Sequence, residues 1–391
     1  MLAMPFNGAA ESLRQGDESM RLLIEKSALL KSLQHVTSVV ERRNTIPILA
    51  NVSLRAEGDM LHLKATDLDI EVTEVARAET ATPGGTTVPA HTLHDIVRKL
   101  PEGAQIELAG KGDEGRLAIT AGSSRFLLAC LPADDFPDLG LDGMSHRFEL
   151  PSQDLRRLID KTRFAVSTDE TRYYLNGIYL HAIEADGGWH LRSVATDGHR
   201  LARMDVGLPD GGMGMPGIIL PRKTVTELAK LLADHGDTVA VELSANKIRF
   251  TVGNVVLTSK LIDGTFPDYQ RVVPQGNDKI MRVDNGVFIS AVDRVSTLSS
   301  EKGRAVKLNI SEDRLVLSVN NPESGSATEE LSVDYNGEPL EIGFNARYLL
   351  DISQQFEGDR AMFKLSDPSA PTVLQDEKDS SALYVLMPMR V

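Results

Sequence analysis

The sequence repeats one structural pattern three times, and this repeat limits the possible folds more than any other feature. Each third opens with a short apolar strand, a turn and a segment with apolar residues at helical spacing. The three openings are RLLIEKSALLKSLQHVTSVV from Arg21, HRFELPSQDLRRLIDKTRFAV from His146 and KIMRVDNGVFISAVDRVSTLS from Lys279. We therefore expect three similar domains in tandem.

The rest of each third predicts antiparallel sheets. Two strands of alternating polar and apolar residues follow each opening, and EGD, ADGG or SED joins them as a hairpin requires. A second strand–helix phrase comes next, in TTVPAHTLHDIVRKL, IILPRKTVTELAKLL and IGFNARYLLDISQQF, and a further hairpin closes each third. Because hairpins pair strands antiparallel, we expect an α+β fold with two helices per domain covering one side of the sheets.

Loop-like stretches place the domain boundaries. DLGLDGMSH and PQGNDK separate the thirds, which predicts domains over residues 20–145, 146–276 and 277–391. Residues 1–19 have neither a basic start nor an apolar central run, so we interpret them as a disordered extension or a cloning remnant rather than a signal peptide. The chain has one cysteine, Cys130, which fits a reducing, cytoplasmic compartment. No apolar run approaches the roughly 18 residues that a membrane span needs.

Positive charge is concentrated in the predicted helices, although the net charge of the chain is −14. Over the six helical phrases (28–43, 92–99, 152–163, 222–230, 286–302 and 345–355) there are 15 Lys and Arg but 8 Asp and Glu, an excess of +7. The simpler interpretation is that Lys and Arg are good helix formers on solvated faces. The alternative is that the helices form one basic face, which would attract phosphate without regard to base sequence.

Five motifs together resemble one protein family. They are RYYLNG (172–177), VATDGHRLA (194–202), FPDY (266–269), GFNARYLLD (343–351) and the terminal YVLMPMR (384–390). In this combination and order they resemble the bacterial DNA polymerase III β subunits, the sliding clamps, from Met20 to Val391. The resemblance implies three DNA-clamp domains per chain, with sheets outside and helices inside, in a ring closed by two chains head to tail.

The family resemblance also implies a function and partners. It implies a non-catalytic processivity factor that encircles double-stranded DNA without sequence preference and tethers the replicative polymerase. Its expected partners are a second copy of the chain, the polymerase alpha subunit, an ATP-driven clamp-loader complex and other proteins with a clamp-binding motif. No cofactor, catalytic residue, metal or membrane contact is implied.

The resemblance implies two roles for the apolar tail. Tyr384 to Leu386 are expected to complete a sheet, and Met387 to Arg390 to form the lip of a groove that binds Gln- and Leu-containing peptides of partner proteins. Methionine is flexible and polarizable, so one groove accepts many sequences, while Arg200 and Arg390 are expected to hold a partner's carbonyl or carboxylate. The groove positions are Leu175, Thr196, Gly198, His199, Arg200, Leu201, Pro267, Val272, Asn345, Tyr348, Pro371, Met387, Pro388, Met389 and Arg390.

Two further surfaces are implied. The DNA-contacting candidates are Arg43, Tyr173, Tyr174, Arg222 and Lys223, together with the basic helix residues Arg156, Arg157 and Lys161. The joint between the two chains is expected at Phe126 and Leu128 on one side and at Thr297 and Leu298 on the other.

Three other interpretations of the same residues remain open. Asp67, Asp69 and Glu71 would lie on one face of a strand, either as a cation site of a metal-dependent nuclease or as a solvated sheet edge. TDGHR (196–200) suggests either catalysis or a turn that shapes the groove, and the turn is favoured because no Gly-x-Ser-x-Gly elbow is present. A peptide-binding scaffold unconnected to DNA is the third alternative.

Overall fold

The computed structural model describes residues 20–111, 115–140, 143–234, 237–299 and 304–390. The predicted extension at residues 1–19 lies outside this part of the chain. The chain divides into two compact units, the first comprising residues 1–141 and 253–259 and the second residues 142–252 and 260–391. The second and third predicted domains thus share one compact unit, and the exact domain boundaries stay a prediction.

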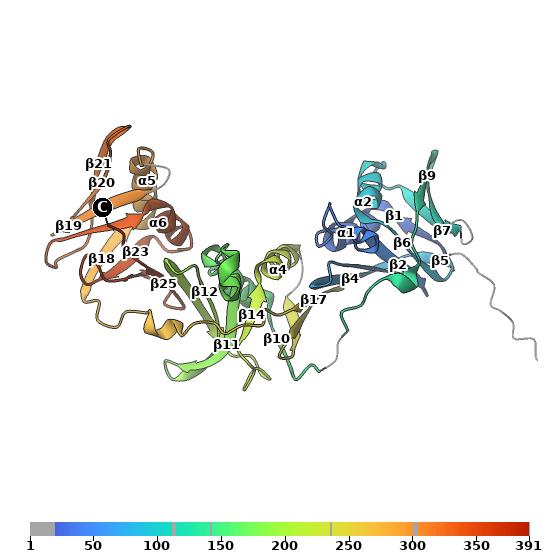
Figure 1. The fold of residues 1–391 in the computed structure, drawn as a ribbon, viewed down its shortest axis with the longest axis horizontal. Helices are drawn as coiled ribbons and strands as arrows, with labels where there is room; N and C mark the ends of the chain where they lie inside the picture. Colours follow the sequence, from blue (N-terminus) through green and yellow to red (C-terminus); the bar gives the residue numbers. More distant parts are fainter. Residues whose placement is uncertain (1–19, 112–114, 141–142, 235–236, 300–303, 391) are drawn as a thin grey trace, which may run out of the picture. The chain divides into compact units, whose positions relative to one another are not determined.

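The described residues of the first unit form two antiparallel sheets with the helices α1 and α2 (Figure 1). One sheet has the order β5-β1-β7-β8-β9, and the other includes β4-β3-β2-β6 with β17 beside β4. Helix α1 packs against α2 and against strands β3 and β4. The elements are β1 (Arg21–Glu25), α1 (Lys26–Thr37), β2 (Asn51–Glu57), β3 (Met60–Thr66), β4 (Ile70–Arg77), β5 (Glu79–Thr82), β6 (Gly84–Pro89), α2 (Ala90–Lys99), β7 (Gln105–Lys111), β8 (Arg116–Ala121), β9 (Ser124–Ala129) and β17 (Val255–Lys260).

The second unit holds the other four helices found in the described residues. They are α3 (Ser152–Asp160), α4 (Arg222–Asp234), α5 (Asn285–Ser296) and α6 (Ala346–Ser353), and they pack in the pairs α3–α4 and α5–α6. The strands are β10 (His146–Pro151), β11 (Gly177–Ala185), β12 (Gly188–Thr196), β13 (Arg200–Gly207), β14 (Ile218–Pro221), β15 (Thr238–Leu243), β16 (Lys247–Val252), β18 (Lys279–Asp284), β19 (Ala305–Ser311), β20 (Arg314–Asn321), β21 (Gly325–Ser332), β22 (Leu340–Asn345), β23 (Arg360–Leu365), β24 (Thr372–Asp376) and β25 (Ala382–Leu386).

One large sheet joins the second and third repeats. Its order is β14-β11-β12-β13-β25-β24-β23-β18, and the antiparallel pair β13–β25, in which Arg200 faces Leu386, connects strands of the two repeats. Every residue of β25 is buried. The prediction that Tyr384 to Leu386 belong to a sheet is confirmed, and the strand lies inside the sheet rather than at its edge.

The threefold pattern predicted from the sequence is present in the element order. Each third runs strand, helix, strands, then again strand, helix and a three-stranded meander, as in β18-α5-β19-β20-β21 and β22-α6-β23-β24-β25. The strand pairings between these elements are antiparallel, as the hairpins predicted. Helices at matching places in each third pack against one another in pairs.

Several helices end earlier than the sequence pattern predicted. The first ends at Thr37 rather than at 43, the third at Asp160 rather than at 163, and the fifth at Ser296 rather than at 302. Near each of these ends a hydroxyl group donates to a carbonyl oxygen four residues back: Thr37 to Leu33 at 2.6 Å, Thr162 to Leu158 at 2.7 Å and Thr297 to Asp293 at 3.3 Å. Side chains of this type compete with the backbone for helix hydrogen bonds.

The earlier ends reduce the charge excess of the helices. Arg42, Arg43 and Arg163 lie outside the helices as the structure bounds them. The six described helices hold 11 Lys and Arg against 7 Asp and Glu, an excess of +4 rather than +7. The helices are still basic in a chain of net charge −14.

Candidate functional site

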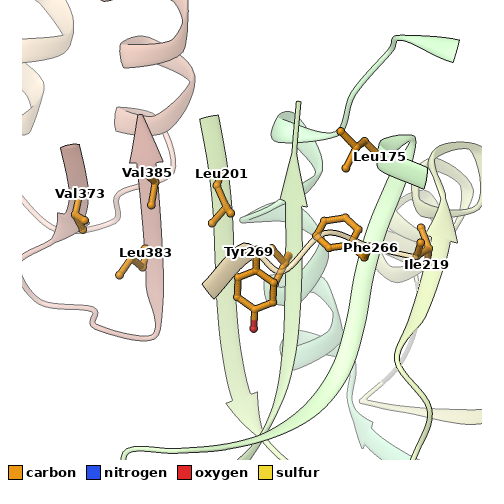
Figure 2. Close-up of a cluster of buried hydrophobic side chains, with 9 residues drawn as sticks. Leu175, Leu201, Ile219, Phe266, Tyr269, Val373, Leu383 and Val385 are labelled. Carbon is orange, nitrogen blue, oxygen red and sulfur yellow. The ribbon is translucent and has the colours of Figure 1, made fainter. Parts of the chain in front are cut away.

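An apolar cluster in the second unit forms the floor of the candidate site (Figure 2). Leu175 and Leu201, two predicted groove residues, lie in it with side chains from β12, β13, β14, β24 and β25. The segment after β17 crosses this cluster and contributes Phe266 and Tyr269. The buried members are Leu175, Val194, Leu201, Ile219, Phe266, Tyr269, Val373, Leu383 and Val385.

The groove residues predicted from the sequence include only part of this floor. Phe266, Tyr269, Val373, Leu383 and Val385 were absent from the predicted groove, although FPDY and the tail were noted as motifs. Alternation along ALYVL (382–386), which places Leu383 and Val385 on one face of a strand, was the signal that could have found the last two. Phe266 stacks on Tyr179, with ring centroids 4.9 Å apart and planes 7° from parallel.

The TDGHR segment is a tight turn between β12 and β13. Asp197 Oδ1 accepts hydrogen bonds from the backbone N–H groups of His199 at 2.9 Å and Arg200 at 3.0 Å, while Thr196 Oγ1 donates to the Arg200 carbonyl at 2.7 Å. Gly198 has a φ of +89°, which favours glycine. Asp197 thus stabilises the turn, which confirms the prediction that this motif forms one.

Arg200 holds the turn against its surroundings. Its guanidinium bonds Asp197 at 3.2 Å, Asp351 at 2.6 Å and the Phe164 carbonyl at 2.8 Å. It also lies 4.2 Å from the ring centroid of Tyr348, an attractive cation–π geometry. Because the side chain is buried and three of its N–H groups are bonded within the protein, Arg200 positions the site, and its predicted contact with a partner's carboxylate stays a prediction.

Helix α6 brings the third repeat to the same place. Asn345 caps the helix by accepting from the backbone N–H groups of Arg347 and Tyr348. This positions the Tyr348 ring, which is stacked on His199 with centroids 6.4 Å apart and planes 25° from parallel. Three predicted groove residues, Asn345, Tyr348 and His199, are therefore brought together.

The tail after β25 is fixed by its backbone and exposes apolar side chains. The N–H of Met387 donates to the His199 carbonyl at 3.0 Å, and that of Met389 to the Gly343 carbonyl at 2.9 Å. The Met387 side chain is 39% exposed, while Pro388 and Met389 are half-buried and Arg390 is exposed. A segment held in this way presents Met387 to solvent beside the apolar cluster.

The remaining groove candidates lie on the segments that border the cluster. Pro267 is exposed and Val272 is 40% exposed, both on the segment that carries Phe266 and Tyr269. Pro371 precedes β24, and its carbonyl accepts from the Asn277 amide at 2.8 Å. Exposed apolar side chains over a buried apolar floor form a surface suited to an apolar peptide.

A cavity in the same unit brings together three of the DNA-contacting candidates. This cavity, of about 410 Å³, is lined by Tyr173, Arg222 and Lys223, with Asn176, Pro221, Thr226, Glu227 and Ile262. Tyr173 is 53% exposed and meets Tyr174 edge to face, with centroids 5.8 Å apart. An exposed aromatic ring next to two cations is suited to a nucleic-acid backbone and its bases.

The other basic candidates differ in availability. Arg43 is exposed in the first unit, and Arg156 is exposed on α3, where it pairs with Asp160 at 3.2 Å. Arg157 is half-buried and bonds Asp379 at 2.7 Å. Lys161 is only 8% exposed, and its Nζ bonds the Gln355 carbonyl and Glu357. Burial and these bonds argue against the predicted phosphate contact at Lys161, and weaken the one at Arg157.

The predicted joint residues lie at two places. Phe126 and Leu128 are on β9, the edge strand of its sheet, where Phe126 is 37% exposed and Leu127, which the prediction omitted, is also exposed. Thr297 and Leu298 directly follow α5, and Thr297 is exposed. An edge strand with exposed apolar side chains is a template for pairing with another chain.

The structure contradicts the cation-site alternative for Asp67, Asp69 and Glu71. Asp67 and Asp69 lie in the turn before β4, where Asp67 Oδ1 accepts from the N–H groups of Asp69 and Ile70. Glu71 is buried in β4 and lies 3.6 Å from Lys64, and burial raises the pKa of its carboxyl. Glu71 is therefore not part of a solvated edge either. Among the described residues no group of three or more His, Cys, Asp or Glu could hold a metal ion.

No helix within the described ranges is long and apolar enough to cross a membrane.

Comparison with family models gives three consecutive matches. Residues 20–140 match the N-terminal domain of the DNA polymerase III beta subunit, residues 149–268 its central domain and residues 270–390 its C-terminal domain. The predicted resemblance and the tandem of three clamp domains are confirmed.

Individual relatives agree over the same length. The chain is 55% identical to the beta sliding clamp of Caulobacter vibrioides (strain NA1000 / CB15N) over 372 residues, which cover 95% of this chain and 100% of the relative. It is 40% identical to that of Escherichia coli (strain K12) over 375 residues, with the same coverage. A crystal structure of the C. crescentus beta sliding clamp with bound PEG has a TM-score of 0.94 at 55% identity, covering 96% and 100% of the two chains. A Bartonella birtlesii sliding clamp bound to griselimycin has a TM-score of 0.92 at 54% identity, covering 95% and 100%.

Proposed function

The chain belongs to the DNA polymerase III beta subunit family, and from this premise we propose that it is a DNA sliding clamp, the processivity factor of the replicative DNA polymerase. The observation that carries this proposal is the full-length match to three successive clamp domains. The protein is a non-catalytic subunit that works by binding DNA, a second copy of itself, the polymerase and other clamp-binding proteins.

We propose that partner peptides bind over the apolar cluster of the second unit. The exposed Met387, Val272 and Pro267 provide flexible and rigid apolar walls above this buried floor. Arg200, Asn345 and the TDGHR turn fix the positions of His199 and Tyr348 beside it. Such a preorganised groove lowers the entropic cost of binding, because its walls are already ordered before the peptide arrives.

We propose that DNA is held by contacts to its phosphates. Arg222 and Lys223 with the exposed ring of Tyr173 provide one such contact, and Arg43 and Arg156 provide others. Phosphate contacts carry no base information, so binding of this kind permits the protein to move along the duplex. The acidic remainder of the chain repels DNA elsewhere.

Retention on DNA comes from topology rather than affinity. We propose that two chains join through β9 of one copy and the segment after α5 of the other, which makes a closed ring with the helices facing the duplex. An ATP-driven loader opens this ring. We place the protein in the cytoplasm, because its DNA substrate is there and its one cysteine is a free thiol.

Topological retention is tested by loading the protein, with a clamp loader and ATP, onto nicked circular DNA. The protein should stay with the circle during gel filtration at high salt and dissociate after the circle is cut once. A linear duplex whose two ends are blocked by bound protein is the matched control, and it should retain the clamp. Equal retention on open linear and circular DNA would refute the ring.

A further inference from the structure

Arg203 lies at the margin of the proposed groove. It is on β13, two residues after Leu201, and pairs with Val194 on β12 and with Leu383 on β25. Val194, Leu201 and Leu383 all belong to the apolar floor. Because neighbouring strands are about 4.8 Å apart and residues i and i+2 share a face, the Arg203 side chain rises from the same face as that floor, whose Leu201, Leu383 and Val385 are seen in Figure 2.

The guanidinium of Arg203 is less completely bonded than that of Arg192, its neighbour on this face. Its Nε is buried without a hydrogen-bond partner in the described part of the chain. The adjacent carboxylate, Asp205, is held by Arg192 through both oxygens, at 2.6 Å and 2.7 Å. Arg192 also donates to the Tyr269 hydroxyl at 3.2 Å. Both oxygens of the Asp205 carboxylate are therefore bonded to Arg192, and Asp205 acts on Arg203 only through its nearby charge.

Arg203 is thus a half-buried cation with unmet hydrogen-bonding capacity. Burial lowers the pKa of its guanidinium, and the nearby charge of Arg192 lowers it further, while Asp205 opposes both effects. Buried polar groups in folded proteins nearly always have a partner, so one without a protein partner needs water or a ligand to supply it. The ligand that best matches a guanidinium is a carboxylate, which can accept two parallel N–H groups.

We propose that Arg203 determines the specificity of the groove by binding a carboxylate of the docked partner segment. The inference rests on the proposed function, and it adds that the preferred partner carries an Asp or Glu next to the apolar residues that cover the floor. Arg200, the other arginine of β13, lies on the opposite face of the strand from Leu201 and Arg203, and it is bonded to Asp197, Asp351 and the Phe164 carbonyl.

The test measures binding of labelled peptides to the full-length protein by fluorescence anisotropy. All peptides share one Gln- and Leu-containing core, and a single Glu is moved through the positions in and beside the core, each paired with a Gln peptide of the same length. At one position the Glu peptide should bind at least fivefold more tightly than its Gln counterpart. Raising the salt concentration should reduce this preference and leave binding of the Gln peptides nearly unchanged.

Two variants locate the preference. Arg203→Met keeps an unbranched apolar stem and should reduce the preference for Glu to less than twofold, because it weakens the Glu peptide more than its Gln counterpart. Arg249→Met is the matched control, because Arg249 is also a partly buried strand arginine whose Nε lacks a partner in the described residues, but lies on β16 outside the apolar floor. It should keep the full preference. Thermal unfolding checks that both variants are folded.

The outcomes separate this inference from the groove itself. If no Glu peptide is preferred, or if Arg203→Met keeps the preference, the inference is overturned. In that case binding of the Gln peptides, and its loss in the double variant Met387→Ala and Met389→Ala, would still support the groove. If the Gln peptides fail to bind the wild type, or bind the double variant equally well, the groove proposal fails.

Discussion

Gly198 shows how one residue can fix the entrance of the groove. Its φ of +89° lies in the left-handed region, and a Cβ at this position would lie 2.7 Å from an Arg172 guanidinium nitrogen. Both neighbours that follow it, His199 and Arg200, contribute to the proposed peptide site. A side chain here would therefore strain the turn and displace Arg172.

We predict that Gly198→Ala destabilises the second unit and weakens peptide binding. A left-handed conformation costs an L-residue roughly 1–2 kcal/mol, which corresponds to a fall of about 2–8 °C in the unfolding midpoint of a unit of this size. Differential scanning calorimetry measures the shift. Gly207→Ala is the control, because a Cβ added at Gly207 would meet no atom within 4 Å and its backbone carries no such strain. Equal midpoints for the two variants would contradict this account.

At the scale of elements, the β3–β4 and β12–β13 hairpins have the same turn but different side chains on the strand face beside it. In the β3–β4 turn, Asp67 Oδ1 accepts from two N–H groups and Thr66 donates to the Ile70 carbonyl at 2.8 Å, as in the β12–β13 turn. The positions of Val194 and Leu201 in the second hairpin correspond to Lys64 and Glu71 in the first. An ion pair thus replaces the apolar floor in the first repeat.

We predict that removing one member of this ion pair destabilises the first unit, whereas replacing both members with apolar residues does so much less. Lys64→Val leaves the carboxylate of Glu71 buried without a cation, and Lys64 also bonds Asp138 at 2.9 Å. Loss of one partner of a fully buried pair costs about 3–5 kcal/mol, whereas an apolar replacement of both is nearly neutral. Because the Lys64 side chain is 28% exposed, the cost here is smaller. Lys64→Val should therefore lower the unfolding midpoint, and the double variant Lys64→Val with Glu71→Leu should recover most of the loss. A double variant less stable than the single one would disprove the argument.

The sequence predicted the secondary-structure elements better than it predicted the long-range contacts of side chains. The helices and hairpins were found because apolar spacing and turn residues are local signals, and the internal repeat confirmed each of them twice more. Local spacing cannot reveal where a long side chain finds its partner. Lys161 looked like an exposed helix cation, but it donates its hydrogen bond to the Gln355 carbonyl, far along the chain. The sequence likewise did not reveal that Arg200 bonds Asp351, because Asp351 is 151 residues away.

At the scale of the whole molecule, function requires two chains. A net charge of −14 would repel DNA, so the proposed clamp depends on local basic residues and on closure of the ring rather than on overall attraction. The basic excess of the six described helices, +4, is small. Weak attraction with closed topology is what sliding needs, because each phosphate contact must break as the protein moves.

We predict that a charge on the outer edge of β9 opens the proposed ring. Phe126→Lys places an ammonium group where we expect an apolar contact with the second chain, and burying it there without a partner is unfavourable. The dimer should weaken by at least tenfold, measured by sedimentation equilibrium, and retention on circular DNA should fall with it. Met60→Lys is the matched control, because Met60 is also 37% exposed in the first unit but lies at the start of β3. If Phe126→Lys stays as dimeric as Met60→Lys, the joint lies elsewhere.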